Sequence, residues 1–134
     1  MNIMKLSKNF SLYEMIFTST GIPNIPTDKE IENMRKLVEN VLQPLRDHMN
    51  RPVIVSSGFR SKEVNKAVGG SKTSGHMLGT AVDITMGTKT LNRLMYNYIR
   101  DNCEFRQLIN EYNYSWIHVE YRKGDNKKQE LVIR

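Results

Sequence analysis

Two histidines and one aspartate are the residues of this sequence best suited to do chemistry. His76 lies in a glycine-containing segment, Asp83 follows it in an apolar run, and His118 lies in the alternating segment SWIHVEY. Two imidazoles and one carboxylate are a common protein ligand set for catalytic zinc, which keeps its fourth position for water. Bound zinc lowers the pKa of water to about 7, so these residues predict a hydrolytic centre.

The surroundings of these residues favour a metal site but leave alternatives open. A carboxylate at Asp83 would be costly to bury alone, and a divalent cation would offset that cost. Period-two alternation in SWIHVEY places Trp116, His118 and Glu120 on one face, which we expect to line a cleft. Spacing alone is equally compatible with a hydrogen-bonded structural histidine and an aspartate in a turn. The third histidine, His48, has no acidic or histidine neighbour at ligand spacing and is interpreted as a surface residue.

Helices in the first third of the chain are predicted from capping signals. Ser11 and Thr27 each begin an S/T-x-x-E capping box, so each should open a helix. The second helix should run to about Asn50, because apolar residues recur at spacings of three and four along it. Pro44 should kink this helix or end its regular part.

The rest of the chain is predicted to be mostly strands. β-Branched and alternating segments indicate strands at 52–57, 80–85, 105–112, 115–122 and 129–134. One or two helical turns are expected at 61–68, a loop at 69–79, and a packed helix at 88–102. This order predicts an α+β fold, with a small, mainly antiparallel sheet and N-terminal helices packed on it.

Composition sets the broad class of protein. The chain has 134 residues, which predicts a single domain over 1–134, and its one cysteine excludes an intrachain disulfide. No apolar run approaches the roughly 20 residues of a membrane span, and no secretory signal is seen. The net charge of +6 fits a polyanionic partner. The charges are scattered, so nucleic-acid binding is not expected, although it stays a third possibility. Oligomeric state and localisation are left open.

Several motifs together resemble the zinc D-alanyl-D-alanine carboxypeptidase family, whose relatives include D-Ala-D-Ala dipeptidases and phage endolysin peptidases of the Hedgehog-type fold. These motifs are SGFRS at 57–61, Asn65, GG at 69–70, SGHMLGTAVD at 74–83 and WIH at 116–118. The S-x-H-x-x-G-x-A-x-D pattern is matched in full and in order. The similarity extends to LSKNFSLYE and VLQPLR, so it covers nearly the whole chain.

This resemblance implies a role for each matching residue. His76, Asp83 and His118 would bind one zinc ion. Arg60 would hold the substrate's carbonyl or carboxylate and stabilise the developing oxyanion, with a structural ion pair as the alternative. Ser74 would hydrogen-bond near the site or to substrate, although it is also a common turn residue. Trp116 is interpreted either as a wall of the substrate cleft or as simple packing.

One departure from the family pattern concerns the general base. Relatives often place an acidic residue three positions before the last ligand, or a histidine two before it, where this chain has Ser115 and Trp116. Glu111 is our candidate. A two-residue turn at Asn113–Tyr114 would pair Glu111 with Trp116, and would place Glu111 diagonal to His118 on the same face. Glu120 is the second candidate, and an exposed sheet carboxylate is the alternative for both.

The sequence therefore predicts a zinc metallopeptidase that cuts an amide bond in peptidoglycan stem peptides, as a carboxypeptidase or an endolysin-like enzyme. The lack of a signal fits a phage or prophage protein that is made in the cytoplasm and released to the cell wall. A non-catalytic zinc-binding domain that recognises wall peptides is the alternative, supported by the missing acid before His118. Which bond would be cut is left open.

Overall fold

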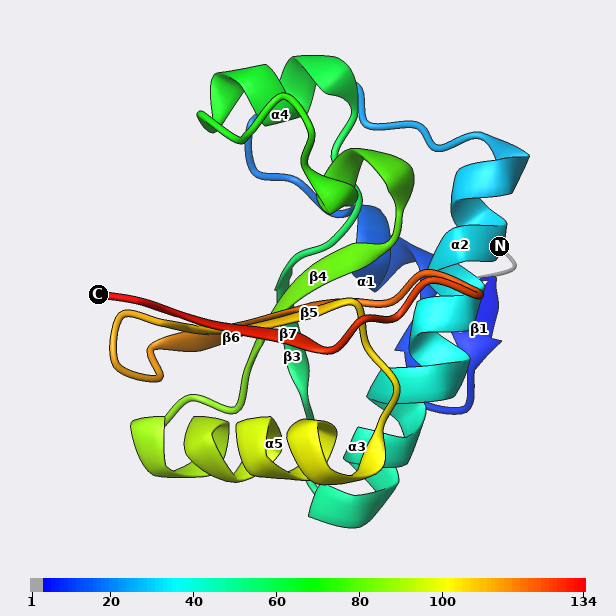
Figure 1. Cartoon of the computed structure of the whole chain (residues 1–134). Coiled ribbons are helices and arrows are strands. Elements are labelled where there is room, and N and C mark those ends of the chain that lie inside the picture. The colour runs from blue at the N-terminus through cyan, green and yellow to red at the C-terminus, as the bar shows by residue number, and fades with distance from the viewer. Residues whose placement is uncertain (1–3) are drawn as a thin grey trace.

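The computed structural model describes residues 4–134, and its main feature is a five-stranded sheet (Figure 1). The strands are β3 (Ile54–Ser57), β4 (Ala81–Thr85), β5 (Gln107–Glu111), β6 (Trp116–Glu120) and β7 (Gln129–Ile133). Their order in the sheet is β3-β4-β6-β5-β7. Neighbours are antiparallel except β5 and β7, which are parallel. The predicted α+β fold with a mainly antiparallel sheet is confirmed.

Helices lie on both sides of this sheet. They are α1 (Leu12–Ile16), α2 (Asp28–Leu37), the π-helix η1 (Val38–Leu42), α3 (Gln43–Met49), α4 (Lys62–Ala67), the 3₁₀-helix η2 (Gly75–Leu78) and α5 (Lys89–Asn102). Helix α5 runs under one face of the sheet, whereas α4 and the segment after it lie over the other (Figure 1). A short hairpin of β1 (Lys5–Ser7) and β2 (Phe10–Ser11), which the sequence did not predict, precedes α1. No helix within residues 4–134 is long and apolar enough to cross a membrane.

Both predicted capping boxes are present. The Ser11 hydroxyl accepts a hydrogen bond from the Glu14 backbone N–H, and the Glu14 carboxylate accepts one from the Ser11 N–H. Thr27 and Glu30 make the same pair of bonds at the start of α2. Each pair satisfies two N–H groups that the first turn of a helix leaves without partners, which fixes where α1 and α2 begin.

The predicted disturbance at Pro44 is also found, although the helix continues through it. Regular α-helix ends at Leu37, and the π-helix follows, in which the Gln43 N–H donates to the Val38 carbonyl five residues back. Pro44 has no N–H to donate, so it fits the first turn of α3. Helix α3 ends at Met49, and Asn50 caps it with a φ of 52°, in the left-handed region.

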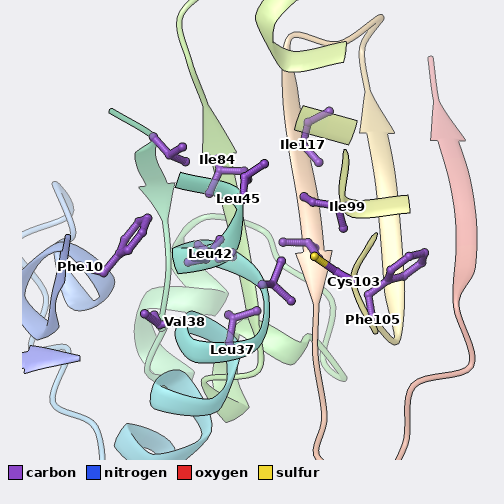
Figure 2. Close-up of a cluster of buried hydrophobic side chains, with 14 of the residues drawn as sticks. Phe10, Leu37, Val38, Leu42, Leu45, Ile84, Ile99, Cys103, Phe105 and Ile117 are labelled. Atoms are coloured by element: carbon purple, nitrogen blue, oxygen red, sulfur yellow. The ribbon is translucent and has the colours of Figure 1, made fainter. Parts of the chain in front are cut away.

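The hydrophobic core fills the space between α5, the α2–η1–α3 segment and one face of the sheet (Figure 2). Leu37, Val38, Leu42 and Leu45 come from the helical segment and have no exposed surface. From the sheet, alternate strand residues enter the same cluster, so every second position faces away from it. Those outward positions form one wall of the functional site.

Candidate metal centre

His76 is held at the start of a short helical turn by its own loop. The Ser74 hydroxyl accepts a hydrogen bond from the His76 backbone N–H at 3.1 Å, and η2 follows where an irregular loop was predicted. The turn ends at Gly79, whose φ is +76° and whose Cβ would stand 2.6 Å from the Glu30 carbonyl oxygen. Only glycine fits this position, so the loop packs closely against α2.

The orientation of the His76 ring is fixed by a backbone carbonyl. Its Nδ1–H donates to the Gly58 carbonyl at 2.7 Å, and the side chain is almost fully buried. With the proton on Nδ1, the neutral ring keeps the Nε2 lone pair free. Metal-binding histidines commonly donate their second nitrogen to such a carbonyl, so this arrangement is suited to metal binding through Nε2.

Asp83 and His118 are brought together by strand register. They are directly paired across β4 and β6, and opposed residues project from the same face of a sheet. The His118 Nδ1–H donates to Asp83 Oδ1 at 2.9 Å, and His76 Nε2 lies 3.4 Å from the same oxygen. One ligand atom from each of the three residues lies within 4.8 Å of the others. The three side chains named from the sequence therefore converge on one point.

This donor set fits a divalent transition-metal ion. Two imidazole nitrogens and one carboxylate oxygen are typical of catalytic zinc sites with three protein ligands. Burial raises the pKa of Asp83, but its side-chain contacts with His118 and His76 lower the pKa by more, so that it lies well below its ordinary value. The carboxylate is therefore ionised at neutral pH, as a metal ligand must be.

Arg60 is fixed at the edge of the same cluster. Its Nε donates to the Ser57 hydroxyl at 3.0 Å, its Nη1 to the Asn65 side-chain oxygen at 3.4 Å, and its Nη2 lies 3.6 Å from Asp83 Oδ2. Its backbone N–H also donates to the His76 carbonyl. These contacts hold the guanidinium beside the ligand cluster, where it can meet a negative charge.

Glu111 lies on the face of the sheet that carries His118. The predicted register is confirmed, with Glu111 opposite Trp116 and Ile109 opposite His118. The predicted two-residue turn is wrong: no ladder pairing occurs within 112–115, and Tyr112, Asn113 and Tyr114 all have positive φ. The longer turn adds two residues to the predicted one, an even number, so it leaves Glu111 on the expected face.

The environment of Glu111 suits a group that must gain and lose a proton. Burial and the Asp83 charge raise its pKa, while a hydrogen bond from the Trp116 indole N–H to Glu111 Oε2, at 2.5 Å, acts in the opposite direction. The pKa of Glu111 is raised on balance. Glu111 lines a cavity of about 650 Å³ that is also lined by the ligand cluster, Arg60 and Ser74.

A family model named Peptidase M15 matches residues 8–120. The chain belongs to this family. M15 peptidases use zinc, so the protein is placed among the zinc peptidases, and its His–Asp–His cluster agrees with that class. A search of curated proteins finds none that matches the chain.

Glu120 occupies a different position in this M15 peptidase from the one expected of a base. It is 6% exposed, and its Oε2 accepts hydrogen bonds from the Thr80 hydroxyl at 2.6 Å and Arg122 Nε at 3.0 Å. Arg106 Nε lies 3.6 Å from its other oxygen. This carboxylate is engaged on both oxygens, so Glu111 is the better placed of the two candidates.

The contacts of Trp116 and three cationic residues of the cavity were not predicted from the sequence. The Trp116 ring packs against Tyr112, with ring centroids 5.1 Å apart, and it does not belong to the lining of the cavity. Its predicted contact with substrate stays a prediction, whereas its bond to Glu111 was not anticipated. Arg106, Arg122 and Lys127 line the cavity and were not singled out, because they lie in the segments that flank the strands and share no motif.

A larger cavity of about 930 Å³ lies next to this one but lacks its chemistry. Its lining includes Ile25, Phe59 and Met77, and it shares Gly69 with the smaller cavity. None of the three clustered ligand residues lines it. The smaller cavity is therefore the candidate active site.

Proposed function

We propose that this M15 peptidase hydrolyses amide bonds in peptidoglycan stem peptides, as a D-Ala-D-Ala carboxypeptidase or an endolysin-like peptidase, with one zinc ion held by His76, Asp83 and His118. The observation that carries the proposal is the convergence of these three side chains in an open cavity that also contains Glu111 and Arg60. The net charge of +6 favours retention on an anionic cell wall.

The ligand side chains are held in position by their neighbours. His76 is oriented by the Gly58 carbonyl, Asp83 is kept ionised by its neighbours, and His118 is fixed by the pairing of β4 with β6. When bound, zinc supplies a Lewis acid that polarises a carbonyl and makes water a stronger acid at neutral pH. The three residues come from a loop and two strands, so the fold must be intact before the site exists.

Glu111 is the proposed general base and acid. The Trp116 indole N–H donates to Glu111 Oε2, which leaves Glu111 Oε1 to accept a proton from the attacking water. The same carboxyl group would then give that proton to the leaving amine. The raised pKa of Glu111 brings it nearer to neutrality, where a group can carry out both transfers.

Arg60 and Ser74 are proposed to act on the substrate. Arg60 stays charged and is already fixed by Ser57 and Asn65, so its guanidinium can stabilise the oxyanion without reorganising. The Ser74 hydroxyl oxygen accepts the His76 N–H, which leaves its own hydrogen available to donate to a substrate carbonyl.

The test is turnover of a synthetic stem peptide by zinc-loaded protein, followed by mass spectrometry. We expect the wild type to release product and Glu111→Gln to lose about 10²- to 10⁴-fold in rate. The exposed Glu104 provides the matched control, and Glu104→Gln should be unchanged. Metal analysis of each variant should give the same zinc content.

The outcomes separate the alternatives. Full activity in Glu111→Gln would remove Glu111 from the proposed role but keep the peptidase. No turnover by any zinc-loaded preparation, with stem peptides still bound, would favour a zinc-binding domain that recognises wall peptides. Binding to nucleic acid that weakens steeply with salt would instead support the third possibility.

A further inference from the structure

The two ends of the candidate active site, taken along the strands, carry different residues. Residues paired across β6, β5 and β7 form rows that cross these strands. The middle row contains His118, Ile109 and Leu131, from β6, β5 and β7. The row on one side contains Trp116, Glu111 and Ile133, and the row on the other contains Glu120, Gln107 and Gln129. Rows two residues apart are separated by about 7 Å. The proposed base and Glu120 therefore lie on opposite sides of the metal ligands.

Three cationic residues gather at the Glu120 end of the cavity. Arg106 immediately precedes β5, Arg122 follows β6, and Lys127 precedes β7. The start of β5 pairs with the end of β6 and with the start of β7, so these positions meet at the same end of the three strands. All three residues line the cavity that contains the metal ligands.

Glu120 holds the two arginines in place. Its buried carboxylate accepts from Arg122 Nε at 3.0 Å and lies 3.6 Å from Arg106 Nε, and Arg106 also pairs with Asp125. Glu120 also packs on the metal-binding loop, since a Cβ at Gly75 would stand 2.2 Å from Glu120 Oε2. Glu120 is thus a positioning residue that fixes the cationic group relative to His76.

The cationic group has donors that the chain itself does not use. Arg122 contributes only its Nε to Glu120, and within residues 4–134 its two terminal amino groups make no hydrogen bond. Lys127 forms no ion pair in the same part of the chain. Among residues 4–134, the ion pairs of these three cations use two carboxylates, Glu120 and Asp125, so one positive charge of the group is left without an ion-pair partner.

We infer that Arg122 and Lys127 form a subsite for a carboxylate of the substrate, about two residues of extended chain from the bond that is cut. The inference rests on the proposed function and specifies its substrate as an anionic peptide. A guanidinium offers paired donors to a carboxylate, and lysine adds a mobile charge. Glu111 at the other end repels a carboxylate, so the cavity accepts such a peptide in one direction.

The experiment uses two synthetic stem peptides that differ only in a carboxylate and its carboxamide. Hydrolysis by the zinc-loaded full chain gives kcat/KM for each, and calorimetry on the Glu111→Gln background gives Kd without turnover. The variants are Lys127→Gln and Arg122→Gln, with Lys123→Gln as the matched control. Lys123 is exposed on the same turn and does not line the cavity.

We expect the wild type to bind and hydrolyse the carboxylate peptide about tenfold better or more, the size expected for a charge-assisted hydrogen bond. Lys127→Gln and Arg122→Gln should each reduce that preference severalfold, whereas Lys123→Gln should keep it. Arg122→Gln also removes an ion-pair partner of buried Glu120, so this variant can fail to fold. Lys127 is exposed, so Lys127→Gln then tests the subsite by itself.

The two proposals fail in different ways. Equal turnover of both peptides by the wild type would overturn the subsite and leave the peptidase intact. No turnover, with the carboxylate peptide still preferred in binding and that preference lost in Lys127→Gln, would overturn the peptidase and keep the subsite. Equal binding of both peptides by every protein would overturn the subsite in either case.

Discussion

The two faces of the central sheet are built from alternate residues of the same strands but have different chemistry. Val82, Ile117 and Val119 face α5 and the core and have no exposed surface. Their immediate neighbours Asp83 and His118 face the cavity and contact each other. A shift of one position along β4 or β6 therefore separates residues that stabilise the fold from residues that form the site.

This contrast implies that stability and activity can be removed independently. The core face depends on apolar area and close packing, which many side chains share. The cavity face depends on a few atoms, among them the Asp83 oxygen that both histidines approach. Substitutions at adjacent positions should therefore produce opposite phenotypes.

The largest expected effect on activity is at His118. His118→Ala removes one of the three ligands, so peptide hydrolysis should fall to the level measured without enzyme. The free energy of unfolding, measured with urea in the presence of a chelator, should change by about 1 kcal/mol, because no core contact is lost and Arg60 and His76 still lie beside Asp83. A large loss of stability in this variant would show that His118 belongs to the structural face.

The matched change on the other face is Ile117→Ala, one residue earlier. Deleting this fully buried side chain should lower the free energy of unfolding by about 2–5 kcal/mol. Activity per folded molecule should stay near that of the wild type, because Ile117 does not line the cavity. Urea titration and an activity assay below the unfolding transition check both parts. Lost activity in the folded variant would mean that the two faces are not independent.

The smallest expected effect is a change in pH dependence at Trp116. Trp116→Phe keeps an aromatic ring against Tyr112 but removes the N–H that donates to Glu111. That bond lowers the pKa of Glu111, so its loss should raise the pKa further. A general base must be deprotonated, so the acid limb of kcat/KM should move to higher pH. The rate just above the wild-type midpoint should fall severalfold. An unchanged pH profile would show that Glu111 does not take part in the rate-limiting proton transfer.

Much of the core face could be predicted from the sequence, because it follows from short-range patterns. The capping boxes at Ser11 and Thr27 fix two helix starts, and period-two alternation around His118 assigns inward and outward residues. The same alternation, with the family motif, gave the three converging ligand residues and the face of Glu111. The helix starts and strand faces depend on residues within one element or one hairpin, whereas the meeting of the three ligand residues was implied by the family motif.

Features that depend on distant pairing could not be predicted. Strand β7 follows β6 but lies parallel to β5, and nothing in its own sequence specifies that neighbour. The turn at 112–114 uses positive φ at two tyrosines, a conformation that tyrosine rarely favours. The cationic group of Arg106, Arg122 and Lys127 exists only because β5, β6 and β7 align their ends.

Two of the three histidines, His76 and His118, are proposed to hold a single zinc ion together with Asp83. Calorimetry and metal analysis of the purified chain measure whether this ion binds and how many ions each chain holds. His48 is exposed, stacks on Tyr98 and is not part of the ligand cluster, so His48→Ala is the control for His76→Ala. We predict one zinc per chain in the wild type and in His48→Ala, and none in His76→Ala at the same free zinc concentration. Equal zinc binding by His76→Ala and the wild type would show that His76 is not a ligand of this ion.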